Sequence, residues 1–283
     1  MANVSLEEFK KKLMEINEIS TLPQVMARIM KIVTDENSCA ADLAKEITKD
    51  KSLTAKILKI VNSAYYGFYR EIVKVSDAVV VLGFNEIKRL SLAMSVLDMF
   101  GKDKQAEHRL ALWNHSLMCA AMSDILEKEW GLQHHGAFTA GILHDIGKAV
   151  LDQYFPPMFA AVQVLMHEHS IQAYEAEQRL FGFDHSDIGS WLSEKWNLPQ
   201  NLIEAIKTHH QPEQARIEPE LAKVVFVANR LANEFLKIKS AGLKPAEVAY
   251  EGDPDFLPEK KLELLLQLDN RITGSTAADL IMT

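Results

Sequence analysis

Apolar residues recur every three to four positions along most of the chain, which is the spacing of one face of an α-helix. The rhythm is clear over residues 22–32, 43–47 and 53–60. Further helices are predicted over residues 85–100, 108–129, 136–146, 156–168, 171–181, 185–196, 199–209 and 218–238, with a last one from 260 to about 268. The apolar stretch 78–82 resembles a strand, but its short length between helical patterns predicts a buried helix that ends near Gly83. The pattern predicts an all-α fold.

The distribution of histidines divides the chain into parts. All ten histidines lie at or after His108, and a polar, glycine-led link at 101–105 precedes them. We therefore expect an N-terminal helical half (1–104), a histidine-bearing half (105–240) and a C-terminal helical extension (241–283). Because the link is short, the apolar face of Leu53, Ile57 and Val61 is expected to dock on the histidine-bearing half.

Composition and charge narrow the class of protein. The chain is 48% hydrophobic and 25% charged, as soluble globular proteins are. A net charge of -8 argues against binding to the phosphate backbone of nucleic acids as the main function. Two cysteines, Cys39 and Cys119, do not make a disulfide framework. No apolar run reaches the length of a membrane span, and the charged first residues lack a signal-peptide core, so the expected location is the cytoplasm.

The most informative segment is 141–148, which reads GILHDIGK. His144 and Asp145 place two ligands for a divalent metal side by side, Gly147 is expected to let the backbone turn sharply behind them, and Lys148 offers a cation to a phosphate oxygen. A His-Asp pair can also simply cap a helix end. The spacing of the other histidines favours metal binding, because helices that each donate one inward ligand return to a shared centre at such intervals.

Several ordered motifs together resemble the HDOD domain. They include Ile60 to Gly67 (IVNSAYYG), the Leu-Gly ending at Gly83, Trp113 to Ser116 (WNHS), the 141–148 segment, and Trp196 to Pro199 (WNLP). The resemblance extends over roughly residues 18 to 235. It implies a bacterial, HD-domain-like helical bundle with an N-terminal helical subdomain. It also implies a regulatory output module in signal transduction, without an established catalytic activity.

The resemblance further implies a set of metal ligands by analogy with HD-domain phosphohydrolases. One ion would be held by His115, His144 and Asp145, and a second by Asp145 together with His185 and either His209 or His210. The HD pattern places another aspartate after a Val-Ala pair, where this chain has Asn229. A neutral amide binds a metal more weakly than a carboxylate does, so the first ion is expected to bind weakly. The Gly-Tyr-Pro motif of the related cyclic-dinucleotide phosphodiesterases is absent after His210.

Two functions remain open at this point. The first is a regulatory module that acts through a signalling protein partner and retains a degenerate metal site. The alternative is a metal-dependent phosphohydrolase that acts on a nucleotide or another phosphate ester, with Asp145 and Lys148 as catalytic residues. Either would use one or two divalent ions (Fe, Mn, Zn, Ni or Mg), and a phosphate-containing ligand is compatible with both. Nucleic acid and membrane partners are not expected.

The remaining histidines are expected to play no part in a site. His134 and His135 fall in an apparent loop, and His167 and His169 lie near a helix end, where surface positions are common. Cys119 follows His115 by one helical turn and is interpreted as a small core thiol rather than as a residue that faces the same cavity.

Overall fold

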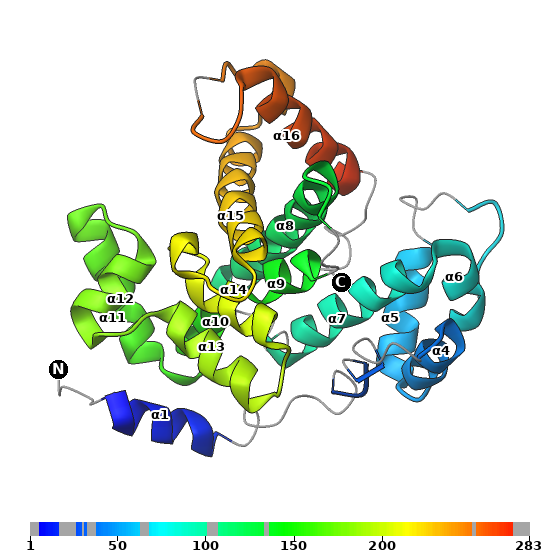
Figure 1. Cartoon of the computed structure of the whole chain (residues 1–283), viewed down its shortest axis with the longest axis horizontal. Helices are drawn as coiled ribbons and strands as arrows, with labels where there is room; N and C mark the ends of the chain where they lie inside the picture. The colour runs from blue at the N-terminus through cyan, green and yellow to red at the C-terminus, as the bar shows by residue number, and fades with distance from the viewer. Residues whose placement is uncertain are drawn as a thin grey trace.

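The computed structural model describes residues 6–16, 27–29, 31–32, 38–62, 68–100, 107–132, 136–250 and 253–273. None of these residues lies in a β-strand, and the regular elements are helices (Figure 1), so the all-α class is confirmed. The helices are α1 (Leu6–Glu15), α4 (Ala40–Thr48), α5 (Lys51–Val61), α6 (Val75–Leu82), α7 (Phe84–Phe100), α8 (Glu107–Glu129), α9 (Ala137–Leu143), α10 (Ile146–Tyr154), α11 (Pro156–His169), α12 (Ala173–Phe181), α13 (His185–Lys195), α14 (Gln200–Thr208), α15 (Pro219–Ser240) and α16 (Pro258–Thr273), with short 3-10 turns η1 (Pro212–Gln214) and η2 (Pro245–Glu247).

Two of the predicted helices differ from the observed ones. The helix expected over 136–146 breaks at His144, and α10 follows as a separate helix. The stretch 78–82 is helical and ends at Gly83, whose positive φ of 85° suits glycine. It is not buried throughout, because Val80 is 84% exposed and Val81 is 52% exposed. One face of this short helix packs on α4 and the other faces solvent.

Helices α4 to α7 form a lobe at one side of the molecule (Figure 1). Helix α5 begins at Asp50, whose carboxylate accepts a hydrogen bond of 2.9 Å from the backbone N–H of Leu53. The apolar face that includes Leu53 and Ile57 is buried, mainly against α4, α6 and α7. It is α7 that packs on α8 and α9, so the lobe reaches the histidine-bearing half through α7 rather than through the face of α5.

The close contact between α8 and α9 depends on Gly141. A Cβ atom at this position would lie 2.8 Å from the Cα of Ala120 and 2.7 Å from the Oγ of Ser123, both on α8. Only glycine fits at such distances, since α9 lies directly on the backbone of α8. This approach brings the end of α9, at His144, beside His115 of α8.

A second close contact joins α10 to α13 at Gly147. The expectation that Gly147 makes a sharp turn is wrong, because the residue lies inside α10. Its importance is steric instead: a Cβ atom would lie 2.0 Å from the backbone oxygen of His185. The missing side chain lets the start of α13 approach the start of α10, which places His185 next to Asp145.

The first helix packs far from the helices that follow it in sequence. Phe9 of α1 is fully buried, with ring centroids 4.6 Å from those of Phe155 and Phe183. The Nζ of Lys10 lies 4.4 Å from the centroid of the Trp191 ring, and Figure 1 shows α1 alongside α13. Helix α1 therefore covers the aromatic end of the histidine-bearing half. Among the described helices, none combines the length and apolar character needed to cross a bilayer.

Candidate metal centre

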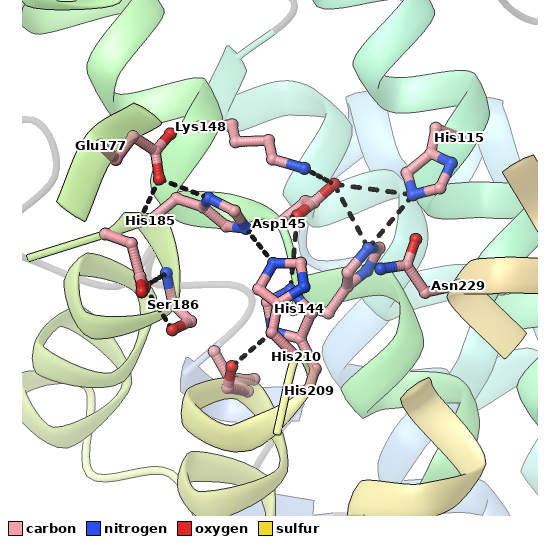
Figure 2. A network of polar contacts seen from close by, with 12 residues as sticks. His115, His144, Asp145, Lys148, Glu177, His185, Ser186, His209, His210 and Asn229 are labelled. Carbon is pink, nitrogen blue, oxygen red and sulfur yellow. Dashed lines mark hydrogen bonds and ion pairs between the residues drawn. The ribbon is translucent and has the colours of Figure 1, made fainter. Parts of the chain in front are cut away.

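The predicted site residues come from six places in the fold and meet around one carboxylate (Figure 2). His115 lies on α8, His144 and Asp145 lie at the junction of α9 and α10, and Lys148 lies on α10. The others come from the start of α13, the end of α14 and the middle of α15; they are His185, His209, His210 and Asn229. Helices distant in sequence thus converge, as the spacing of the histidines predicts.

The two oxygens of Asp145 face two different groups of side chains. Oδ2 lies 3.3 Å from the Nε2 of His144, 3.6 Å from that of His115 and 2.8 Å from the Nζ of Lys148. Oδ1 lies 3.2 Å from the Nε2 of His185 and 3.7 Å from that of His209. Asp145 is therefore placed as a carboxylate shared between two clusters.

Each cluster has the compactness of a metal site. In the first, ligand atoms of His115, His144 and Asp145 all lie within 4.8 Å of one another, and in the second the same holds for His185, His209 and His210. All are buried except His210, which is partly exposed. Imidazole nitrogens and a carboxylate without thiolates suit first-row transition ions such as manganese, iron, nickel and zinc.

Three of the histidines are held with their outward-facing nitrogen as a hydrogen-bond donor. The Nδ1 of His144 lies 2.7 Å from the carbonyl oxygen of Gly141, and the Nδ1 of His209 lies 2.7 Å from that of Ile206. The Nδ1 of His185 lies 2.6 Å from the Oε2 of Glu177. Since these oxygens can only accept, each Nδ1 carries a proton, and each Nε2 is directed into the centre.

The inner atoms of the centre lack the partners that a closed hydrogen-bond network would supply. Nε2 of His209 is buried and makes no hydrogen bond within the described chain. Two pairs of imidazole nitrogens face each other, His115 with His144 at 3.2 Å and His210 with His185 at 2.8 Å. Imidazole nitrogens and carboxylate oxygens that converge in this way fit a bound cation. The residues present therefore fit a divalent metal.

Without a metal ion, two histidines of the centre hold a proton more tightly than an ordinary histidine does. Burial works against charge on His144, but Asp145 outweighs it and raises the pKa of His144 to about 10. Burial likewise opposes charge on His185, yet Glu177 and Asp145 raise its pKa above the ordinary value. Each facing pair of histidines can then share one proton. A metal ion that binds here replaces protons.

The other histidines of the centre remain neutral. Burial lowers the pKa of His115 to about 3 and, with the charge of His185 nearby, lowers that of His210 to about 3. Burial also lowers the pKa of His209 well below its ordinary value. Asp145 stays ionised, because His144 and Lys148 outweigh its burial and hold its pKa well below the usual range. Neutral imidazoles and an ionised carboxylate are the forms that ligate metals.

Asn229 lies beside His144 and is hydrogen-bonded through its side chain to His115. Its Oδ1 accepts a hydrogen bond of 3.0 Å from the Nδ2 of Asn233. Figure 2 shows the amide nitrogen turned toward the ring of His144. An N–H group cannot ligate a cation, so ligation by Asn229 requires its oxygen rather than its nitrogen to face the ion. Its role as a ligand stays a prediction.

Two contributors to the centre were missed in the sequence, and both lie on α12. Glu177 binds His185, and the ring of Tyr174 stacks on that of His210, with centroids 4.4 Å apart and planes at 23°. Neither residue has a recognisable spacing to the ligands, since a loop separates α12 from α13. Of the histidines excluded from the site, His167 and His169 are exposed as predicted, whereas 133–135 lie outside the described residues.

Comparison with known proteins identifies the family of the chain. The model of the HDOD domain matches residues 19–212, about two thirds of the chain. The chain belongs to the HDOD family. The matched region includes the clustered histidines and Asp145, whereas Asn229 lies beyond it. An HDOD domain protein of unknown function from Geobacter sulfurreducens has a similar structure, with 26% identity, a TM-score of 0.72, and coverage of 95% of this chain and 88% of that one.

The chain is also similar to proteins with other names. A candidate phosphohydrolase from Shewanella amazonensis shares the fold, with 24% identity, a TM-score of 0.72, and coverage of 93% of this chain and 96% of that one. An uncharacterised protein of Treponema pallidum is 26% identical over 217 residues, which is 75% of this chain and 42% of that protein. Ribonuclease Y of Aquifex aeolicus is 34% identical over 110 residues, 39% of this chain and 15% of that enzyme. The chain thus spans less than half the length of these two curated relatives.

Proposed function

We propose that this HDOD protein is a signal-transduction output module with a divalent metal centre, and that it acts through a protein partner. The observation that carries the metal centre is the arrangement of three histidines whose Nδ1 atoms are held by acceptors. Their Nε2 atoms point at the two sides of Asp145, at distances between 3.2 and 3.7 Å. A purely structural cluster has no need of a buried inner nitrogen without a hydrogen-bond partner, such as the Nε2 of His209.

The ligands divide into two proposed ion positions. One would be formed by His115, His144 and Oδ2 of Asp145, and the other by His185, His209, His210 and Oδ1 of Asp145. When bound, a divalent ion polarises a phosphoryl oxygen and lowers the pKa of a water molecule. The nitrogen-rich donor set favours manganese, iron, nickel or zinc over magnesium, which prefers oxygen ligands.

The regulatory function is favoured over catalysis by the surroundings of Asn229. A carboxylate there would complete the first ion position with a second negative charge, as the HD-domain pattern has it. Asn229 brings no charge, and its oxygen accepts from Asn233. A centre in which only one ion position has its full set of ligands can hold a metal ion. It is less suited to stabilising both the attacking and the leaving oxygen of a phosphoryl transfer, which two-metal sites do.

The second candidate function is hydrolysis of a phosphate ester, and Lys148 is the observation in its favour. Its Nζ lies 2.8 Å from Asp145, and its side chain is 23% exposed, so it borders the centre on the solvent side. A cation at this point can attract the negative charge of a phosphate. The partial similarity to an enzyme named as a ribonuclease is compatible with phosphodiester chemistry, over less than half of the chain.

Metal analysis combined with a hydrolysis assay tests the proposal. Protein purified without chelator should contain at least one transition ion per chain, and Asp145→Asn should contain much less because it loses the shared charge. Wild-type protein should not hydrolyse bis(p-nitrophenyl) phosphate with added Mn²⁺. Turnover that is present in wild type and absent in Asp145→Asn would make the phosphohydrolase the correct function. Metal-free wild-type protein that gains no ion on incubation would contradict both candidates.

A further inference from the structure

Glu177 is a buried carboxylate whose partners belong to the first residue of α13. Its side chain is 2% exposed, although glutamate is rarely buried without a partner. Oε2 accepts a hydrogen bond of 2.8 Å from the backbone N–H of His185 and one of 2.6 Å from the Nδ1–H of the same residue. One oxygen thus fixes both the start of α13 and the orientation of the His185 ring (Figure 2).

His185 differs in this respect from the other two restrained histidines. His144 and His209 each donate to a carbonyl three residues earlier in their own helical turn, so their restraint is local. His185 depends on a side chain from another helix. A carboxylate is also a stronger acceptor than a carbonyl, and it increases the electron density on the far nitrogen of the ring. The ligand strength of His185 is therefore controlled from α12.

The histidine rings of the two proposed ion positions are not held equally firmly. The position that includes His185 has two restrained histidines, and the ring of its third, His210, is stacked on Tyr174. In the other position, the Nδ1 of His115 is buried without a hydrogen bond, so the orientation of this ring is not fixed in the same way. Restrained ligands lose less freedom when an ion binds, which raises affinity.

We infer that Glu177 is the positioning residue of the centre, which holds His185 for ligation and makes the His185–His209–His210 position the tighter of the two. The inference deepens the proposed metal centre and rests on it. Helix α12 supplies no ligand itself, but through Glu177 it controls the metal affinity of the His185–His209–His210 position. Ions should fill this position first and the His115–His144 position second.

Calorimetric titration of the chelator-stripped, full-length protein with Mn²⁺ tests the inference. Removal of the carboxylate in Glu177→Ala should weaken the tighter binding step by about 10–100-fold, the range found for orienting partners of metal ligands. Glu177→Gln keeps an oxygen that accepts from His185 but loses the charge, so its loss should be smaller. This second variant also decides the question if Glu177→Ala does not fold.

Gln178 provides a matched control on the same helix. Its Nε2 donates to Oδ2 of Asp184 at 2.9 Å, so it joins α12 to the cap of α13 without touching a histidine. Gln178→Ala should keep the affinity of the tighter step within about threefold. An equal loss in Gln178→Ala would show that helix packing, and not the bond to His185, sets the affinity, and would overturn the inference.

The remaining outcomes separate this inference from the proposed function. Tight Mn²⁺ binding by wild type with unchanged affinity in folded Glu177→Ala would refute the inference and leave the metal centre in place. No Mn²⁺ binding by wild type would refute both. In His115→Ala the Glu177-sensitive step should persist and the weaker step should disappear; loss of the tighter step instead would contradict the predicted order of filling.

Discussion

The substitution Gly147→Ala offers a sharp test of how the fold assembles the centre. The added Cβ would lie 2.0 Å from the backbone oxygen of His185, 2.8 Å from its carbonyl carbon and 2.9 Å from its Cα. Cβ atoms in proteins essentially never approach other heavy atoms within 3.0 Å. The opposing atoms belong to the backbone at the start of α13, so no side-chain rotation can relieve the contact. The two helices must separate.

The size of the separation follows from the same distances. Raising the contact from 2.0 Å to 3.0 Å requires a movement of at least 1.0 Å between α10 and the start of α13. Metal–ligand distances tolerate only about 0.2 Å. The movement therefore takes His185 out of reach of an ion that Asp145 also binds. Gly147→Ala should lose most of the metal at the His185 position and about 1–3 kcal/mol of stability through overpacking.

The assays are elemental analysis of metal content and thermal unfolding of the metal-free protein, where each kcal/mol corresponds to about 2–4 °C. Gly189→Ala is the comparison on α13, because its Cβ would first meet a side-chain atom, the Cγ2 of buried Ile206 at 2.9 Å, rather than backbone. It should lose less metal than Gly147→Ala. If Gly147→Ala retains wild-type metal content, or gains stability as alanine does at unconstrained helix positions, the steric account of the α10–α13 contact is wrong.

Three further changes test the chemistry of the centre. Asn229→Asp adds a negative charge beside His115 and should raise the metal content at the weaker position, as measured by elemental analysis. Equal metal content in the variant and the wild type would show that the amide of Asn229 does not weaken metal binding. Lys148→Met removes a cation 2.8 Å from Asp145, so Mn²⁺ affinity should rise several-fold while inorganic phosphate binds less tightly, both measured by titration. Mn²⁺ affinity should also rise with pH, by about tenfold per unit for each proton displaced, because His144 has a pKa raised to about 10 and holds its proton at neutral pH. Equal affinities at pH 6 and pH 8 would show that no proton is displaced.

The metal-free protein should also have a stability maximum near the ordinary histidine pKa. His115 and His210 have folded-state pKa values lowered to about 3, so below about pH 6.5 the unfolded chain binds more protons and stability falls as pH falls. His144 behaves in the opposite way: its raised pKa stabilises the fold below about pH 6.5, and this contribution is lost as pH rises toward 10. Chemical denaturation across pH 4 to 9 measures the effect, and a stability that rises steadily to pH 9 would contradict it.

The fold class and the convergence of the histidines were accessible from the sequence because both depend on periodic or local signals. A helical rhythm identifies helices such as α14 and α15 closely, and the spacing of His115, His144 and His185 indicates a shared centre. The break between α9 and α10 was not visible, since helical periodicity continues across His144 and Asp145. The exposure of Val80 was missed for a related reason: an apolar residue does not reveal whether another element covers it.

The parts that could not be predicted depend on contacts between distant helices. Gly147 reads as a turn residue in the sequence, and only the approach of α13 shows that its role is to leave space. Glu177 resembles an ordinary solvated acid on an amphipathic helix until its distance to His185 is known. The packing of Phe9 of α1 beside α13 rather than on the following helices is likewise a tertiary property that no local pattern carries.

Anomalous X-ray diffraction from crystals grown with Mn²⁺ tests the proposed metal centre, because it locates each ion. We expect a strong anomalous peak among Asp145, His185, His209 and His210, and a weaker one beside His115 and His144. A crystal of the folded protein without an anomalous peak at Asp145, at millimolar Mn²⁺ and neutral or higher pH, would contradict the metal centre.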